Sequence, residues 1–181
     1  LSAETLWKKM DSKFWDRLVI QLIQREITVK EASQQMRTHI ESLELGALQE
    51  EVRSFLKMGE SHEGYAVRSS VVDEDGAHFS FAGQMDSFLF QKSEQEVLHS
   101  IRKVWISAFA ERALEYRLLN KLPLHGIRVA VIVQEMLDAD NAGVLFTANP
   151  SNGDRNTCLI SASHGVGEGV VAGTVDCDEY A

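Results

Sequence analysis

Apolar side chains recur at helical spacing through the first third of the chain. Between residues 3 and 24 a large apolar residue returns at about every fourth position, which predicts one amphipathic helix with a broad apolar face. Thr28 followed three residues later by Glu31 is a capping-box pattern, which predicts the start of a second helix that Gly46 ends. Residues 47–58 then predict a third helix. These three helices are expected to form a small helical segment.

After this segment the spacing of apolar residues becomes that of strands. Short apolar runs predict strands near 65–69 and 86–90. A second capping box at Ser93 opens a long helix that is expected to reach Leu119. Apolar and β-branched runs predict three more strands, with turns between them: strands at 127–137, 144–148 and 157–162, and turns at 138–143 and 149–154.

This order of elements indicates the fold class. Helices come first, then a helix among strands, then consecutive hairpins, and such an order is typical of an α+β fold with an antiparallel sheet and packed helices. We expect a helical lobe at residues 1–60 and a second domain at residues 61–181.

Composition and charge narrow the function classes. Of the 181 residues, 44% are hydrophobic and 25% charged, as in ordinary globular proteins. The net charge of −9 argues against a nucleic-acid-binding surface, which needs a basic stripe. No run approaches the ~18 apolar residues of a membrane span, so no membrane partner is expected.

The cysteines and the chain ends bear on cellular location and on whether the chain is part of a longer protein. Cys158 and Cys177 lack metal-ligand spacing and do not suggest a disulfide scaffold, so a reducing, cytoplasmic location is expected. The charged first stretch does not resemble a signal peptide. Both ends, Leu1 and Ala181, are interpreted as cuts within a longer protein.

The most informative candidate chemistry stands at the end of a short apolar run. Arg68, Ser69 and Ser70 follow Tyr65-Ala66-Val67 directly. An arginine offers a planar fork of donors that suits phosphate oxygens and keeps its charge at any working pH. Taken alone, an arginine in this position is more often solvent-facing or ion-paired than part of an anion site.

The chain resembles one known family in several motifs. Their order matches that of the N-terminal nucleotide-binding module of the phosphoenolpyruvate synthase and pyruvate phosphate dikinase family across residues 64–180, which implies an ATP-grasp-like lobe. The motifs are Ala66-Val67-Arg68-Ser69-Ser70, Phe81-Ala82-Gly83-Gln84, Val133-Gln134-Glu135-Met136, Gly143-Val144-Leu145-Phe146-Thr147, Asn149-Pro150, Gly165-Val166-Gly167-Glu168, Val171-Ala172-Gly173 and Asp178-Glu179-Tyr180.

This resemblance implies roles for two groups of residues. It places Arg68 on the phosphates of ATP, where Ser69 and Ser70 either donate to the same oxygens or only hold the turn. It also makes Gln134-Glu135-Met136 the hinge that reads adenine, largely through backbone groups. A strand that simply leaves the sheet is the alternative for the hinge.

Downstream residues are implied to line the nucleotide cleft. Thr147 and Asn149 are expected there, although an Asn-Pro step is also a common turn opener. Gly165 and Gly167 could bring backbone donors close to phosphate, but their segment is neither a Walker A loop nor a complete dinucleotide-binding fingerprint. Glu168 is a candidate for Mg²⁺ or a ribose hydroxyl, with a solvent-facing carboxylate as the alternative.

No catalytic residue or metal ligand is assigned. Consecutive acids at Asp73, Glu74 and Asp75 are more typical of a solvated loop tip than of a metal site. In the resembled family the phosphorylated histidine belongs to a separate domain, so none of the six histidines is a candidate.

The resemblance implies a function and leaves alternatives open. It implies the ATP- and Mg²⁺-binding part of a phosphoenolpyruvate synthase-like phosphotransferase, which phosphorylates a histidine in another domain for transfer to pyruvate. Its partners would be ATP and the phosphohistidine and acceptor-binding domains. A rifamycin phosphotransferase shares the same module, and a non-catalytic module that binds nucleotide or protein is the third reading. The family's Gly-Gly-Lys segment and later metal ligands are missing, so this chain alone is expected to be catalytically incomplete.

Overall fold

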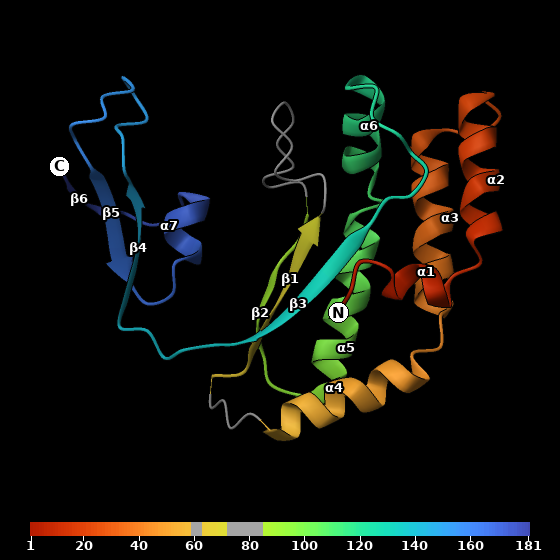
Figure 1. Ribbon diagram of the computed structural model, residues 1–181, viewed down its shortest axis with the longest axis horizontal. Helices are drawn as coiled ribbons and strands as arrows, with labels where there is room; N and C mark the ends of the chain where they lie inside the picture. The colour runs from red at the N-terminus through yellow and green to blue at the C-terminus, as the bar shows by residue number, and fades with distance from the viewer. Residues whose placement is uncertain (59–62, 72–84) are drawn as a thin grey trace. The chain divides into compact units, whose positions relative to one another are not determined.

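The chain forms two compact units in the computed structural model, Leu1–Met136 and Leu137–Ala181 (Figure 1). The structure describes residues 1–58, 63–71 and 85–181. Each unit is described by itself below. The expected division of the chain at residue 60 stays a prediction.

The first unit combines six helices with one antiparallel sheet among its described residues. The strand order is β2-β1-β3, and both pairings are antiparallel. This arrangement confirms the predicted α+β class. The elements are α1 (Thr5–Lys9), α2 (Ser12–Ile23), α3 (Val29–Ser42), α4 (Gly46–Met58), β1 (Tyr65–Val71), β2 (Phe88–Gln91), α5 (Glu94–Ser107), α6 (Glu111–Leu119) and β3 (Val129–Glu135).

Helix α5 lies at the centre of this unit and covers one face of the sheet, in contact with all three strands (Figure 1). Helix α3 packs on α5 and α6, and α2 packs on α3. Two tryptophans in the core, Trp15 and Trp105, are fully buried. Trp15 also donates a hydrogen bond from Nε1 to the carbonyl of Leu124 at 2.8 Å, which satisfies its polar atom inside the core. The helices of the first sixty residues therefore share one hydrophobic core with the sheet.

The single helix predicted over residues 3–24 is wrong, because the structure has two helices there. Met10 is extended, with ψ 141°, and ends α1. Asp11 then caps α2, and its Oδ1 accepts a hydrogen bond from the backbone N–H of Lys13 at 3.0 Å. Aspartate satisfies the free donors of a helix start, so it can begin a new helix inside a continuous apolar pattern.

The long helix predicted from Ser93 to Leu119 is also divided. Helix α5 ends at Ser107, whose Oγ donates to the carbonyl of Val104 at 2.8 Å. Ala110 is extended, with ψ 151°, before α6 begins. Gly46 is a further correction, since it begins α4 and does not end the preceding helix, which stops at Ser42.

Both predicted capping boxes are confirmed. Thr28 Oγ1 accepts from the backbone N–H of Glu31 at 3.2 Å, and Glu31 accepts from the backbone N–H of Thr28 at 2.8 Å. The second box joins Ser93 and Glu96 in the same reciprocal way. Backbone donors hold the pKa of both glutamates below its ordinary value.

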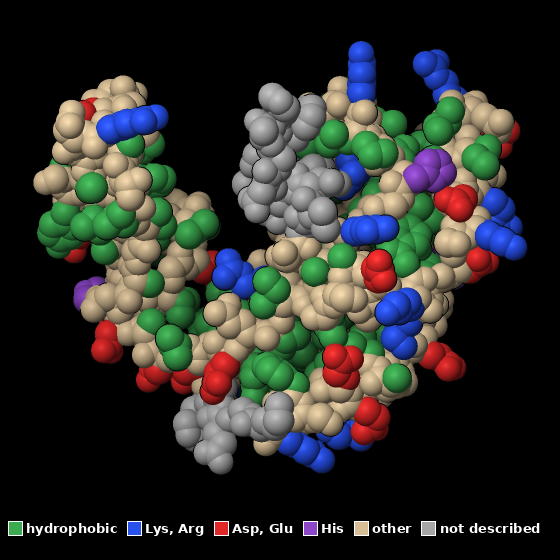
Figure 2. Space-filling model, viewed as in Figure 1, with side chains coloured by type: hydrophobic (Ala, Val, Ile, Leu, Met, Phe, Trp, Pro, Cys, Tyr) green, Lys and Arg blue, Asp and Glu red, His purple; other side chains and the backbone are tan. Residues whose placement is uncertain are grey.

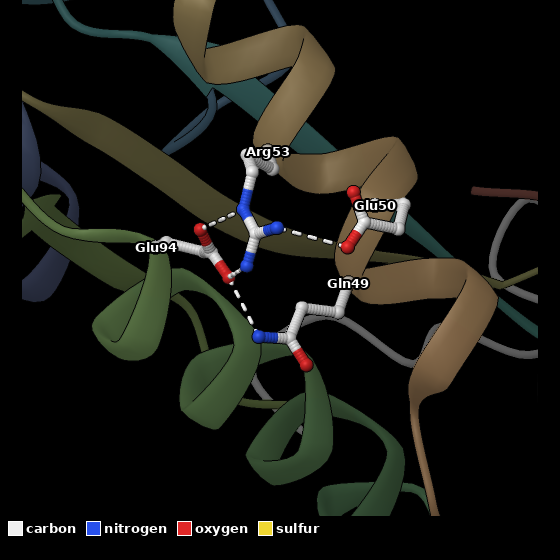
Figure 3. A network of polar contacts seen from close by, with 4 residues as sticks. All are labelled: Gln49, Glu50, Arg53 and Glu94. Atoms are coloured by element: carbon white, nitrogen blue, oxygen red, sulfur yellow. Dashed lines mark hydrogen bonds and ion pairs between the residues drawn. The ribbon is translucent and has the colours of Figure 1, made fainter.

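A polar network joins α4 to the start of α5 (Figure 3). The Nε of Arg53 donates to Glu94 at 2.8 Å, and the side-chain amide of Gln49 donates to the same carboxylate at 2.8 Å. Arg53 also reaches Glu50, one turn back on its own helix, at 2.8 Å. The hydrogen bond from Arg53, followed by that from Gln49, lowers the pKa of Glu94. A charge-assisted bidentate contact thus joins two helices that also contribute to the same hydrophobic core.

The second unit is a smaller sheet with one short helix. Its strand order is β4-β5-β6, antiparallel throughout. The predicted turn at 138–143 is wrong in its second half, because β4 already begins at Asn141. The sequence did not predict α7 or β6. The elements are β4 (Asn141–Phe146), β5 (Leu159–His164), α7 (Glu168–Ala172) and β6 (Asp178–Tyr180).

The two faces of this second sheet differ. Helix α7 packs on the face that carries Ala142, since a Cβ on Gly167 would lie 3.5 Å from the Ala142 Cβ. Leu145, Ile160 and Tyr180 are paired across the three strands on the opposite face. Their exposed fractions are 56%, 37% and 58%. Figure 2 shows hydrophobic side chains at the surface of this unit.

Candidate functional site

The first group of predicted site residues lies on the pair formed by β1 and β3. In this antiparallel register Ala66 is opposite Gln134, Arg68 is opposite Ile132, and Ser70 is opposite Ala130. Successive side chains of a strand point to opposite faces of a sheet. Because Val67 and Val131 are buried under the helices, residues 66, 68 and 70 lie on the opposite face of the sheet, here called the open face; Arg68 is exposed there, whereas the small Ala66 is buried.

Arg68 is the charged group of this open face. Its side chain is exposed and forms no ion pair or hydrogen bond with any residue that the structure describes. A guanidinium has five N–H donors, and none of those of Arg68 is bonded to a residue that the structure describes. This geometry fits both the solvent-facing alternative and the phosphate-binding role.

The two serines beside Arg68 are separated by the pleat. Ser70 shares the open face with Arg68, whereas Ser69 is opposite Val131 on the face that the helices cover. Both serines are half-buried. The structure therefore brings Arg68 and Ser70 to one surface and does not bring Ser69 there.

The predicted hinge is the end of β3. Gln134 is exposed on the open face, opposite Ala66, and thus close to Arg68 in the register. Glu135 is opposite Tyr65 on the other face. The pKa of Tyr65 is raised first by burial of its hydroxyl and second by the negative charge of Glu135. The backbone N–H of Met136 is already bonded to the carbonyl of Gly64 at 2.9 Å.

Met136 also contacts β2, the strand at the other edge of the sheet. Its Sδ accepts a hydrogen bond from the backbone N–H of Phe90 at 3.0 Å. Phe90 has a positive φ of 58° beside an irregularity in the pairing of β1 with β2. A non-glycine residue in this conformation is uncommon, and the sulfur contact gives its donor a partner.

Sequence reasoning missed one residue of the open face, Ile132. It stands opposite Arg68 and is 46% exposed, although it lies in a strand rich in buried valines. Alternation within that strand was the signal for it: with Val131 facing the core, Ile132 must face outward. Its side chain adds an apolar surface beside the guanidinium.

Thr147 and Asn149 lie just beyond β4 in the second unit. Thr147 is exposed. The Oδ1 of Asn149 accepts from the backbone N–H of Ser151 at 2.9 Å, and the carbonyl of Asn149 accepts from Gly153 at 2.8 Å. Asn149 therefore carries the turn chemistry that its Asn-Pro step indicated.

The turn after Asn149 is further fixed by Asp154. Its carboxylate accepts from the backbone of Asn156 at 2.9 Å and from the hydroxyl of Thr157 at 2.8 Å. These bonds lower the pKa of Asp154, the backbone bond most strongly. The turn is thus ordered by its own side chains.

The glycine segment of this unit connects β5 to α7. Gly165 has φ +80°, a conformation that favours glycine, and its N–H donates to the carbonyl of Asp140 at 2.8 Å. Gly167 is the N-cap of α7, and Glu168 is the exposed first residue of that five-residue helix. A positive φ explains Gly165 structurally, without a ligand.

Metal-ligating side chains do not gather in the described part of the chain. No group of three or more His, Cys, Asp or Glu residues there could hold a metal ion. The acidic run Asp73–Asp75 and the motif residues 81–84 lie outside the described residues. Of the helices that the structure describes, none has the length and apolar character needed to cross a membrane.

Comparison with known proteins identifies the relatives of the chain. A rifampicin phosphotransferase of Bacillus cereus is 35% identical over 91% of this chain and 19% of its own length. A probable phosphoenolpyruvate synthase of Methanothermobacter thermautotrophicus is 44% identical over 68% of the chain and 18% of its own length. The prodigiosin synthesizing transferase PigC of Serratia marcescens is 44% identical over 64% of the chain and 13% of its own length.

The chain thus spans less than a fifth of the length of these relatives. A family model for the AMP/ATP-binding domain of pyruvate phosphate dikinase matches residues 2–181, nearly every residue present. The α+β architecture agrees with the ATP-grasp-like fold that the motif order implied. The chain belongs to the pyruvate phosphate dikinase AMP/ATP-binding domain family.

Proposed function

We propose that this chain is the ATP-binding part of a phosphotransferase that phosphorylates a histidine in another domain of its polypeptide and passes the group to pyruvate, as in phosphoenolpyruvate synthase. In this proposal Arg68 binds the phosphates, with Ser70 as a second donor. Gln134, Glu135 and Met136 form the adenine hinge through their backbone.

One observation carries the proposal for Arg68. Its guanidinium is exposed, meets no carboxylate among the described residues, and shares its sheet face with Ser70 and Gln134 in a chain of an AMP/ATP-binding family. Phosphoryl transfer depends mainly on positioning and on neutralising charge on the phosphate oxygens. An arginine supplies the neutralising charge, because it is charged at any working pH, and its place on β1 positions that charge.

The residues of the second unit enter the proposal as lining of the nucleotide cleft. Thr147, Gly165 and Gly167 are proposed to line it, and Asn149 to shape its loop, since that side chain is already engaged in a turn. Glu168 is exposed at the start of α7 and is proposed to meet Mg²⁺ or a ribose hydroxyl.

Magnesium is expected to bind mainly through the nucleotide. Mg²⁺ keeps several waters and is usually held by one or two carboxylates together with substrate phosphates. Because the chain has a net charge of −9, it repels the negatively charged phosphates, so a cation in addition to Arg68 is needed to offset this repulsion.

The acceptor of the phosphoryl group could differ from pyruvate. The relatives include both rifampicin phosphotransferases and phosphoenolpyruvate synthases, so the same type of nucleotide module serves different acceptors. A rifamycin phosphotransferase is thus the second candidate. A non-catalytic module that binds nucleotide or protein is the third candidate, and its protein-binding form is favoured if no ATP is bound.

Calorimetric titration with ATP, with and without Mg²⁺, tests the proposal. It is run on the 181-residue chain and on a polypeptide extended at both ends, each with wild-type Arg68, Arg68→Ala or Arg37→Ala. Arg37 is exposed on α3, so it controls for the loss of one positive charge.

Loss of the Arg68 contacts is expected to cost about 1.5–3 kcal/mol of binding free energy, roughly a 10- to 150-fold rise in Kd. Arg37→Ala should leave Kd unchanged. Equal affinity for Arg68→Ala and wild type would remove Arg68 from the site. If neither length of chain binds ATP, the kinase role is rejected.

A further inference from the structure

One residue at the end of β3 reaches both of the other strands of the first sheet. The backbone N–H of Met136, which follows β3, donates to the carbonyl of Gly64 at 2.9 Å. Gly64 directly precedes β1. The Sδ of Met136 accepts from the backbone N–H of Phe90, in β2, at 3.0 Å. The proposed adenine hinge therefore ends in a contact with the opposite edge of its own sheet.

Phe90 lies in a bulge of β2. The register between β1 and β2 shifts between residues 65 and 67, so that Leu89 and Phe90 both stand opposite Ala66. A bulge leaves its extra residue outside the regular ladder of hydrogen bonds. Phe90 adopts a φ of 58° there, a strained conformation for a residue with a side chain, which persists only where the surroundings hold it. The sulfur of Met136 is one of the contacts that hold the bulge.

The same end of the sheet is anchored in the core. A Cβ on Gly64 would lie 2.8 Å from the carbonyl oxygen of Gln91, so only glycine lets the backbone before β1 approach β2 this closely. The side chain of Gln91 donates to the carbonyl of Leu89 at 2.7 Å and accepts from Ser100 Oγ at 2.7 Å. Ser100 is buried on α5. Both partners of Met136 are thus placed by contacts that continue into the interior.

We propose that the sulfur of Met136 is a positioning group for base recognition. By accepting the Phe90 N–H, it holds the end of β3 at the place where the backbone of residues 134–136 reads adenine. Hydrogen bonds weaken steeply when they are misaligned, so a hinge that reads a base through its backbone depends on where that backbone lies. This inference rests on the adenine hinge of the proposed function and adds the side chain that fixes it.

The preference for ATP over inosine triphosphate measures the position of the hinge. Inosine triphosphate keeps the ribose and triphosphate of ATP but carries a carbonyl oxygen in place of the adenine amine. Calorimetric titrations with Mg²⁺ give the ratio of the two Kd values, on whichever of the two chain lengths binds ATP. The wild type should prefer ATP, and Met136→Leu should lower this preference about three- to tenfold, the usual effect of one lost hydrogen bond.

A second substitution separates the acceptor from simple packing. Met136→Asn places an acceptor oxygen on Cγ, the carbon to which methionine attaches its sulfur, but loses apolar bulk. Met136→Leu keeps the bulk and loses the acceptor. The positioning role predicts that asparagine retains more of the ATP preference than leucine does. A packing role predicts the reverse order.

Two controls complete the design. Met36→Leu replaces a fully buried methionine of α3 and should leave the preference unchanged. Arg68→Ala should weaken both nucleotides by the same factor, because the two share their phosphates, so the ratio of the Kd values stays constant. The melting temperature of each variant reports damage to the fold separately from the change in preference.

An unchanged ATP preference in Met136→Leu would overturn the positioning role while leaving the hinge in place. A greater loss for Met136→Asn than for Met136→Leu would also overturn it. So would equal weakening of both nucleotides with a lowered melting temperature, since the role would then be structural. A wild type that binds both nucleotides alike would reject the adenine hinge itself, and absence of ATP binding would reject the proposed function; either result would remove this inference as well.

Discussion

At the scale of single residues, the pleat of β1 decides which candidates can act together. Ser69 and Ser70 are neighbours in the chain, but only Ser70 shares the open face with Arg68. We expect Ser70→Ala to weaken ATP binding by about 0.5–1.5 kcal/mol, the usual net value of one hydrogen bond. Ser69→Ala should leave the affinity unchanged and alter only the thermal stability. Calorimetry on both variants measures the difference, and a larger loss of affinity for Ser69→Ala would reverse the assigned faces.

Residue type together with the resemblance to the family made Arg68 a candidate, but neither of them placed its neighbours. The apolar run Tyr65–Val67 predicted the strand, and alternation from the buried Val67 would have assigned Ser69 to the core side. The register of β1 against β3, which puts Gln134 and Ile132 beside Arg68, was not predictable. Register depends on pairing between segments about sixty residues apart, and no local pattern encodes that distance.

At the scale of elements, one arginine closes the end of a helix. Arg102 of α5 donates from Nη2 to the carbonyl of Leu43 at 2.7 Å, and from Nη1 to the carbonyls of Ile40 at 3.3 Å and Glu41. These carbonyls lie at the C-terminal end of α3, where helix carbonyls run out of partners within the helix, and that of Ile40 also accepts from the backbone N–H of Leu43 at 3.2 Å. A cation at this position also interacts favourably with the helix dipole.

Arg102→Met is therefore expected to destabilise the protein by about 1.5–3 kcal/mol, because it removes charge-assisted hydrogen bonds and leaves partly buried carbonyls unsatisfied. Arg37→Met, an exposed position on α3, is the matched control and should change stability by less than about 0.5 kcal/mol. Urea unfolding of the two variants gives both values. Equal effects would mean that Arg102 does not hold the α3 end.

Helix starts were more predictable than helix breaks, for a physical reason. Thr28 and Ser93 carry short-range capping chemistry, which is written in four consecutive residues. The breaks at Met10 and Ala110 fall inside apolar patterns that continue on both sides, since each pair of helices packs on the same core. Periodicity reports the buried face, so it predicts continuation wherever that face is kept across a break.

At the scale of the whole molecule, four carboxylates link stability to pH. Glu31, Glu94, Glu96 and Asp154 have their pKa lowered by hydrogen bonds that the folded chain provides. An acid with a lowered pKa binds its proton less readily when folded, so its contribution is present above the unfolded pKa, near 4, and disappears as pH falls through the folded pKa.

The melting temperature should accordingly fall when the pH is lowered from about 6 to 3. Glu94→Gln keeps a polar side chain beside Arg53 but cannot ionise, so its melting temperature should depend less steeply on pH. Glu111→Gln, at the exposed start of α6, is the control. Identical slopes for Glu94→Gln and wild type between pH 3 and 5 would show that the Arg53 contact adds nothing to the pH dependence.

The two compact units differ in what supports their sheets, and this difference should be measurable. The first sheet rests on a core in which Val67 and Val131 are almost wholly buried. None of residues 137–181 is buried, and the row of Leu145, Ile160 and Tyr180 stays open to solvent. Local opening requires little free energy where few apolar contacts must break, so the amides of β5 should exchange about a hundredfold faster than those of β1, or faster still.

A chain shortened to residues 1–136 provides the control, because its core is unchanged. It should keep a cooperative thermal transition and the slow exchange of β1. Equal protection of β5 and β1 in the 181-residue chain would contradict the argument, since the second sheet would then be stabilised by contacts beyond its own residues. A ligand that slows β5 selectively would show that binding supplies the support that burial does not.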